Sequence, residues 1–354
     1  MIDPVRWLRL IPRAAGAALV VVVATAAPAA ADAAGPGDYT SEVTGIVPSV
    51  DGVDAEIRGG DAFLEVTVDE GHTVIVEGYT GEPYLRFLPD GTVERNRLST
   101  ATYLNDDRQG KVDIPAAVTE AGPDAEPEWE EIASGGSYAW HDHRVHWMQE
   151  SSPNVARGEP VGGAYAPWRV PIVADGAKAE IQGTLVFEEA VSPLPYIGLA
   201  VIVAGLLGFY GRGKGLRLTA ALLVAVSAAA VVVGWADYSS TPEGGGNPLH
   251  WALAAVALAT GVGALLLAKR AAGVVLTLAS AAALSGWGLF RVQVLFNPVL
   301  PTELPYPLDR TIVALSLGVS VGAAVVAVLS SGLSLPALAD DATDSNAATA
   351  SRSS

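Results

Sequence analysis

Five long apolar runs fill most of the second half of this chain, and they constrain its fold more than any other feature. Each has about the 20 residues that an α-helix needs to cross the hydrocarbon core of a bilayer. With 50% hydrophobic residues, the 354-residue chain is also too apolar for an ordinary soluble protein. We therefore expect a five-helix transmembrane domain over residues 192–335. Its spans are predicted at 193–210, 216–236, 250–268, 271–290 and 311–333.

The ionisable residues of this half lie at the ends of the apolar runs. Asp237, His250, Arg291, Asp309 and Arg310 all fall near the predicted outer boundary, and no ionisable residue falls at mid-depth. Ion and proton pathways through membranes usually need buried ionisable groups. The composition of the spans therefore argues against a transporter built from these helices alone.

Basic residues follow alternate apolar runs. Arg212, Lys214 and Arg217 come after the first run, and the pair Lys269-Arg270 comes after the third. Because cytoplasmic loops are enriched in Lys and Arg, both connectors are predicted to face the cytoplasm. The chain is thus predicted to be a multi-pass plasma-membrane protein. Residues 336–354, which are mostly small and polar, are predicted to be a disordered cytoplasmic tail.

The first 33 residues have the three parts of a secretory signal. Arginines precede an apolar run over residues 14–27, and small residues follow it. Cleavage would follow Ala31 or Ala33, and without cleavage the segment would be a signal anchor. In both cases the domain that follows is predicted to lie outside the cytoplasm.

Residues 34–191 have the pattern of a β-domain. Short alternating runs such as HTVIVEG and AEIQGTLVFE are separated by turn sequences such as RGGD and PDG. About eight such runs predict an antiparallel β-sandwich of immunoglobulin-like build, with an open barrel as the alternative. Residues 98–167 show little periodicity, so we expect a long loop there, and loops of that length are usually functional or disordered.

The composition of the β-domain excludes several kinds of partner and site. Between Pro36 and Glu189 there are 29 Asp and Glu against 10 Lys and Arg. This charge would repel nucleic acid and anionic lipid surfaces and would concentrate cations. The chain has no cysteine, which excludes disulfides, thiolate metal ligands and a cysteine nucleophile.

The predicted loop contains the stretch WHDHRVHWM, which holds three of the five histidines and the one methionine besides Met1. Imidazole nitrogen binds Zn and Cu, and thioether sulfur prefers Cu(I). His141, His143, His146 and Met148 therefore form a possible ligand set for one copper ion, with zinc as the alternative. The cluster also predicts titration near neutral pH, so proton sensing is a variant of this interpretation.

The spacing of these residues sets a geometric condition on a single-ion site. On a strand, His141 and His143 share one face while His146 and Met148 share the other. A site built from all four therefore requires a turn or bulge near Arg144-Val145. Without that bend, two of the histidines would need an outside ligand such as His72 or a carboxylate.

The neighbouring residues suggest supporting roles and an alternative. Asp142 could orient an imidazole by accepting a hydrogen bond from it, and Trp140 or Trp147 could shield a Cu(I) ion through a cation–π contact. The alternative is a structural seam in which the aromatic rings and Met148 pack the loop onto the sandwich. In that case the histidines would hydrogen-bond acidic neighbours instead of a metal.

The sequence contains no complete catalytic motif that would indicate an enzyme. The His141-x-His143-x-x-His146 spacing resembles the HxHxDH of metallo-β-lactamase-like hydrolases, but Val145 replaces the Asp, and the next histidine is His250 at the membrane. Zincin, nucleophile-elbow and Walker patterns are not found in suitable contexts. Cupredoxin chemistry would need a cysteine. The motifs thus favour binding over turnover.

Three segments carry a resemblance to a known group. GEPYLRFLPDG, ATYLN and WHDHRVHWM, all between Gly78 and Met148, resemble segments of uncharacterised actinobacterial membrane proteins. The resemblance implies a signal, an exported β-domain and a hydrophobic C-terminal half.

Two functional hypotheses follow from these patterns. The first is an extracytoplasmic transition-metal site, with copper preferred, used in metal handling or sensing. The second is a non-catalytic envelope or interaction protein in which the His/Trp loop is structural. Expected partners are the lipid bilayer, a metal ion, and a membrane protein or a second copy of the chain, with no nucleic acid.

Overall fold

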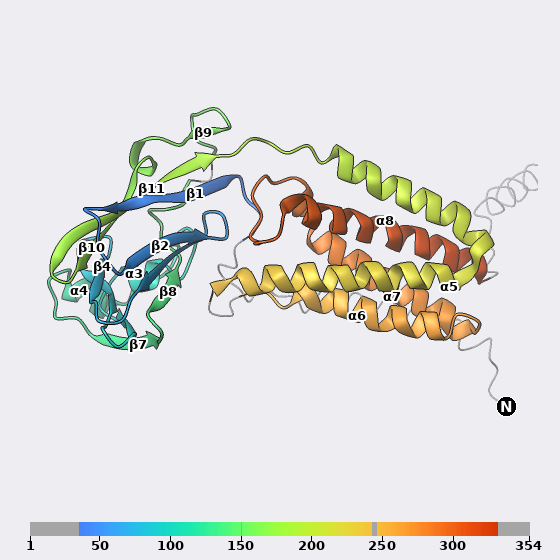
Figure 1. Ribbon diagram of the computed structural model, residues 1–354, viewed down its shortest axis with the longest axis horizontal. Coiled ribbons are helices and arrows are strands. Elements are labelled where there is room, and N and C mark those ends of the chain that lie inside the picture. Colours follow the sequence, from blue (N-terminus) through green and yellow to red (C-terminus); the bar gives the residue numbers. More distant parts are fainter. Residues whose placement is uncertain (1–34, 150, 243–245, 332–354) are drawn as a thin grey trace, which may run out of the picture.

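The computed structural model describes residues 35–149, 151–242 and 246–331 (Figure 1). A β-domain is followed by a bundle of long helices, and the two parts lie end to end. The predicted mixed fold, a β-sandwich followed by an α-helical domain, is confirmed. The predicted signal and the predicted tail lie outside the described residues.

Eleven strands are found in the described part of the β-domain. They are β1 (Tyr39–Val47), β2 (Val53–Arg58), β3 (Phe63–Val68), β4 (Val74–Glu77), β5 (Pro83–Phe87), β6 (Val93–Asn96), β7 (Trp129–Ala133), β8 (Ser137–Trp140), β9 (Glu159–Pro160), β10 (Trp168–Ala174) and β11 (Ala177–Phe187). The eight alternating runs of the sequence correspond to β1 to β6, β10 and β11. These predictions are confirmed.

The strands form two antiparallel sheets. The larger sheet has the order β1-β11-β10-β4-β5-β6-β7, with β9 beside β11, and the smaller sheet has the order β2-β3-β8. Side chains from both sheets meet in one apolar core, for example Leu64 and Val66 of β3 with Leu85, Ile172 and Leu185. In β11 every second residue from Ala179 onward is buried, as the alternation of the sequence predicts.

A close approach of backbone and ring fixes the register of the larger sheet. Trp168 of β10 is fully buried and lies over Gly183 of β11, where a Cβ atom would collide with the indole. The indole Nε1 donates to Ser41 Oγ of β1 at 2.9 Å. Because a buried indole N–H needs an acceptor, this bond ties β1 to the core.

The segment predicted as a long loop, residues 98–167, is more structured than expected. It holds the short helices α3 (Ala101–Leu104) and α4 (Ala116–Ala121), the 3₁₀ turn η1 (Gly163–Tyr165), and strands β7, β8 and β9. The prediction of a loop was wrong for β7 and β8, which pair with β6 and β3. Both are short edge strands, and β7 carries exposed glutamates, so neither shows clear alternation.

Within the described residues, five helices are long and apolar enough to cross a membrane. The described helices of this half are α5 (Leu194–Ser240), α6 (Leu249–Leu266), α7 (Ala271–Phe290), the 3₁₀ turn η3 (Val292–Leu295) and α8 (Tyr306–Ser330). Helix α5 contains two spans, Leu194–Gly211 and Gly215–Ser240, because Gly215 has φ 75° and breaks the helix. The five predicted spans are therefore confirmed.

The ionisable residues at one end of the bundle form a buried cluster. Arg291 donates to Asp237 Oδ2 at 2.5 Å and to Asp309 Oδ2 at 2.7 Å, and His250 also bonds Asp237. Neighbouring Arg310 donates to the carbonyl oxygens of residues 294, 297 and 298. The cluster thus joins α5, α6, α7 and α8, and Arg310 holds the loop between η3 and α8.

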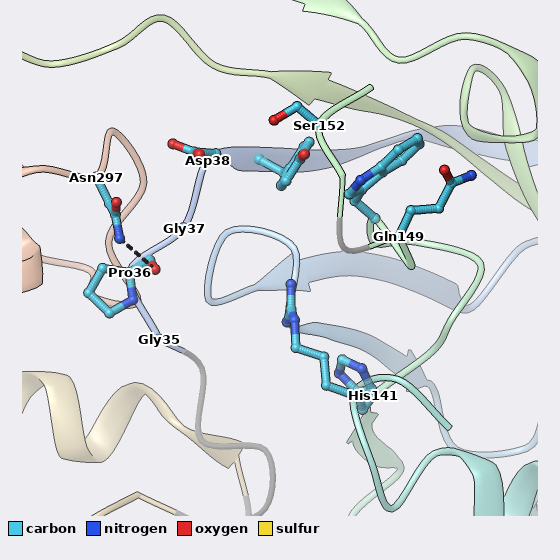
Figure 2. A pocket seen from close by; sticks show the side chains of 11 residues that line it. Gly35, Pro36, Gly37, Asp38, His141, Gln149, Ser152 and Asn297 are labelled. Atoms are coloured by element: carbon cyan, nitrogen blue, oxygen red, sulfur yellow. Dashed lines mark hydrogen bonds between the residues drawn. The ribbon is translucent and has the colours of Figure 1, made fainter. Parts of the chain in front are cut away.

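That loop is also where the β-domain contacts the bundle. Gly37 and Val299 exchange backbone hydrogen bonds of 3.0 and 3.1 Å. Figure 2 shows Asn297 donating to the carbonyl oxygen of Pro36, at 2.9 Å. A cavity of about 520 Å³ opens beside this junction, and residues of both domains line it. The junction therefore brings the end of the bundle close to the histidine-rich segment.

Candidate metal centre

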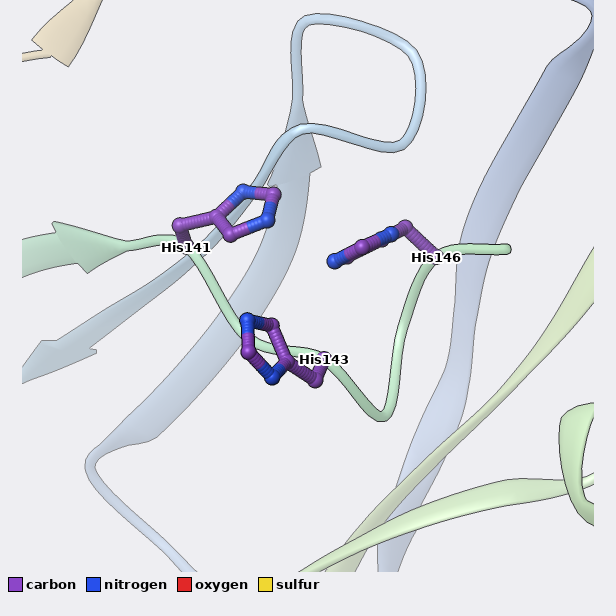
Figure 3. Close-up of side chains that lie close together, drawn as sticks. All are labelled: His141, His143 and His146. Atoms are coloured by element: carbon purple, nitrogen blue, oxygen red, sulfur yellow. The ribbon is translucent and has the colours of Figure 1, made fainter. Parts of the chain in front are cut away.

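The three histidines of WHDHRVHWM lie together at the end of β8. The chain leaves β8 at Trp140 and turns at residues 143–145, where Val145 N–H donates to the Asp142 carbonyl oxygen at 3.1 Å. Figure 3 shows the imidazoles of His141, His143 and His146 arranged around one common space. The bend that a single-ion site required near Arg144-Val145 is present.

The distances between the rings suit one metal ion. Their centroids are 4.3 Å apart for His141 and His146, 5.7 Å for His141 and His143, and 5.5 Å for His143 and His146. One nitrogen from each ring lies within 4.8 Å of the others. Three such atoms all lie within about 2.8 Å of a common centre, and Zn–N bonds are about 2.0 Å long. A contraction of less than about 1 Å would therefore complete coordination.

Backbone carbonyls hold each imidazole by the nitrogen that faces away from the ion position. His141 Nδ1 donates to the Ala62 carbonyl at 2.6 Å, His143 Nε2 to Asp107 at 2.9 Å, and His146 Nδ1 to Trp147 at 3.2 Å. Because a carbonyl oxygen only accepts, these nitrogens carry the hydrogens and the other nitrogen of each ring keeps its lone pair. Metal-binding histidines in proteins are usually oriented by such a bond.

Burial keeps two of the rings neutral. Desolvation is the main cause that lowers the pKa of His141 to about 4, and the charge of Arg108 adds to it, while the hydrogen bond to the Ala62 carbonyl partly opposes both. Desolvation, followed by the neighbouring His141, lowers the pKa of His146 to about 2. Neutral imidazole is the form that binds metal. The two rings can therefore act as ligands at neutral pH without first losing a proton.

No hydrogen bond joins Asp142 to an imidazole among the described residues, so its predicted orienting role gains no support. Its buried carboxylate accepts hydrogen bonds from Arg144 Nε at 2.8 Å, from Arg144 Nη2 at 2.7 Å and from Trp140 Nε1 at 2.9 Å. Burial alone would raise the pKa of Asp142. The charge of Arg144 and the hydrogen bonds that Arg144 and Trp140 donate outweigh burial and lower this pKa to about 2. The buried ion pair of Asp142 and Arg144 stabilises the turn, and backbone carbonyls orient the three histidines.

The two tryptophans pack against other aromatic rings. Trp140 contacts Tyr84 and Tyr138, with ring centroids 6.2 and 6.4 Å apart. Trp147 stacks with Tyr39 at 6.1 Å and donates to the Ser151 carbonyl. Among the described residues, neither indole has a ring contact with the three imidazoles, so their predicted shielding role gains no support. The rings that do contact them are Phe63 beside His141 and Tyr79 stacked on His143.

Two predicted ligands remain to be placed. His72 lies at an exposed position where Nδ1 bonds Asp175 Oδ2 at 2.8 Å, and it is not part of the metal-binding group found among the described residues. Its predicted role as an extra ligand therefore gains no support. Met148 is half-buried, and no described contact joins it to the imidazoles. Its role as a ligand stays a prediction.

The turn between β2 and β3 supports the centre, and the sequence did not reveal this. Ala62 accepts from His141, and the buried carboxylate of Asp61 accepts from Arg108 Nη2 at 2.8 Å to each oxygen. Asp61 also accepts the backbone N–H of Trp147. Only the RGGD turn signal marked this position in the sequence. The centre is thus built from three segments of the chain, residues 61–62, 107–108 and 141–146.

Two cavities flank the histidines. The cavity at the domain junction, about 520 Å³, is lined by Arg108 and Trp147 among others. Figure 2 shows His141 on its wall. A second cavity, about 600 Å³, is lined by His143 and Arg144 together with residues of the η1 region. Each cavity therefore borders one ring of the cluster, while Nε2 of His141 and of His146 is buried.

Comparison with known proteins adds no relative. No protein-family model, curated protein or solved structure matches the chain. The resemblance to actinobacterial membrane proteins therefore stays a prediction, and the function has to be argued from the site itself.

Proposed function

We propose that the β-domain binds one transition-metal ion through His141, His143 and His146. The observation that carries this proposal is a pair of buried atoms, Nε2 of His141 and of His146, which have no hydrogen-bond partner among the described residues. A buried polar atom without a partner costs about 1–3 kcal/mol. An ion between the rings would give both lone pairs a partner and would remove this cost.

Copper is the ion that we propose, in metal handling or sensing outside the cytoplasm. Imidazole suits copper and zinc alike, and copper stands above zinc in the usual order of affinities for divalent ions. The thioether of Met148 is proposed to contribute to Cu(I) only, since thioethers prefer the softer ion. Zinc is the competing ion in the titration described next.

Metal titration of the full-length protein tests the proposal directly. After purification without a histidine tag and treatment with a chelator, the protein is expected to bind one equivalent of Cu(II). An ion present at 100 times its Kd stabilises a folded protein by about 2.7 kcal/mol, so the melting temperature should rise. Copper binding with little effect of zinc supports the choice of ion.

The matched control for this titration is His72→Ala. His72 pairs with Asp175 away from the cluster, so this variant should bind copper as the parent protein does. If neither copper nor zinc binds or changes the melting temperature, the proposal fails. The structural interpretation would then be preferred, since Trp147 does pack between Tyr39 and Tyr165.

The proposed site also requires that the β-domain faces outward, which the absence of cysteine makes easy to test. Thr119 in α4 and Lys269 between α6 and α7 are both exposed. In intact cells, a membrane-impermeant maleimide should label Thr119→Cys and should leave Lys269→Cys unlabelled until the cells are opened. The opposite pattern would invert the proposed topology.

A further inference from the structure

The turn between β2 and β3, residues 59–62, is tied to the candidate metal centre. The carbonyl oxygen of Ala62 accepts from His141 Nδ1 at 2.6 Å. The carboxylate of the neighbouring Asp61 is buried and accepts from Arg108 at 2.8 Å. Coordination of one ion would draw the three imidazoles together by less than about 1 Å. Because His141 is bonded to Ala62, a movement of its ring acts directly on the turn.

The same turn packs against the loop between η3 and α8. Gly60 has φ 81°, and a Cβ atom at this position would lie 2.4 Å from Cγ1 of Val299. Glycine permits both this left-handed backbone and so close an approach. The carbonyl oxygen of Gly60 also accepts from the backbone N–H of Ser41 at 2.9 Å, which fixes the turn against β1. The turn therefore contacts both the metal centre and Val299.

Val299 belongs to a loop that the helix bundle holds in place. It is buried, and it exchanges backbone hydrogen bonds with Gly37 of the β-domain. The next residue, Leu300, is buried in the apolar core of the bundle. Ser240 Oγ of α5 donates to a loop carbonyl at 2.6 Å, and Arg310 of α8 donates to loop carbonyls at 2.8 and 3.0 Å. Val299 therefore lies on a segment that is tied to both α5 and α8.

We propose that metal binding at the three histidines orders the turn 59–62 and, through the contact of Gly60 with Val299, orders the junction with the helix bundle. The inference rests on the proposed metal site and makes it a sensor whose occupancy the membrane domain reads. A turn that the ion has already ordered loses less conformational entropy when it packs against Val299. Metal binding and junction packing then strengthen each other by the same factor.

Hydrogen exchange of the full-length protein in detergent, followed by mass spectrometry, tests the effect of the metal on the junction. Exchange is compared with and without one equivalent of Cu(II). Copper should slow exchange at residues 59–62 and also at Gly37 and Val299, whose backbone N–H groups each donate to the other's carbonyl across the junction. Slower exchange at the turn alone would overturn the inference, because the order would not reach the bundle.

Val299→Ala tests the reverse effect, of the junction on the metal. This change removes the methyl group that lies against Gly60. It should weaken Cu(II) binding about 5-fold or more, since couplings between sites are usually 5–150-fold. It should also remove the slowing of exchange by copper at residues 297–300. Isothermal titration measures the affinity, and the melting temperature of the metal-free variant shows whether it folds.

Val319→Ala is the matched control. Val319 is buried like Val299, but it lies within α8 and packs in the apolar core of the bundle. This variant should bind copper as the parent protein does. An equal loss of affinity in both variants would overturn the inference, because the effect would then come from bundle packing in general.

The remaining outcomes separate this inference from the metal site. If copper binds Val299→Ala as tightly as the parent protein, the two sites are not coupled, although the metal site stands. The exchange experiment uses the parent protein, so it decides the matter even if Val299→Ala does not fold. If copper does not bind the parent protein at all, the proposed function fails first, and the two failures are therefore distinguishable.

Discussion

His146→Ala is expected to lower the affinity for copper at least 100-fold. His146 is fully buried, and one of its ring nitrogens lies within 4.8 Å of ligand nitrogens from both other rings. Loss of a residue that merely orients a ligand typically costs 10–100-fold in affinity, so loss of a ligand itself should cost about 100-fold or more. Isothermal titration with Cu(II), using a competing chelator of known affinity, measures the change.

His141→Ala and His143→Ala should weaken binding in the same way, since each ring supplies one nitrogen. The melting temperature of each metal-free variant shows whether the fold survives, which separates loss of a ligand from loss of structure. A copper affinity that stays the same in all three variants would contradict the metal centre. The variant His72→Ala should again match the parent protein.

Asp142→Ala is expected to destabilise the β-domain by about 3–5 kcal/mol, because breaking a buried ion pair leaves the other charge uncompensated. Asp142 is fully buried, and Arg144 would lose all three of its hydrogen bonds to that carboxylate. For a domain of this size the change corresponds to a fall of roughly 10 °C in melting temperature. Thermal unfolding of the metal-free protein, followed by near-ultraviolet circular dichroism, measures it.

Two further variants make the Asp142 experiment specific. The exposed Asp113 provides the control, because Asp113→Ala removes the same charge without breaking a buried pair. The double variant Asp142→Leu/Arg144→Met removes both charges and should recover part of the loss, since apolar replacements of buried pairs are often tolerated. Melting of Asp142→Ala within 1 °C of the parent would show that the pair does not stabilise the turn.

The elements that leave a regular apolar pattern in the sequence could be predicted. The five spans follow from run length alone, and the eight alternating strands follow from burial on one face. Strands β7 and β8 could not be found in this way, because they are short, lie at sheet edges and carry polar or mixed residues. Their pairing with β6 and β3 is decided by tertiary contacts.

The candidate centre was predictable in its ligands and in the bend that it needed. The groups that orient the three imidazoles could not be predicted. They are backbone carbonyls, and every residue has a carbonyl, so the sequence does not mark them. Asp142 was assigned to an imidazole because carboxylates often play that role. Arg144 competes for it more strongly, since a guanidinium offers charge and several donors at once.

The buried cluster of Asp237, Arg291 and Asp309 has a consequence for how the bundle is assembled. Asp237 lies on α5, Arg291 directly follows α7, and Asp309 lies on α8, and these segments emerge from the ribosome in that order. Asp237 is therefore synthesised before Arg291 and Asp309, so its carboxyl group is without this buried partner until α7 has been made. The second half of α5 can settle at its final depth only once α7 arrives, so these helices are completed together, as a cooperative step in biogenesis.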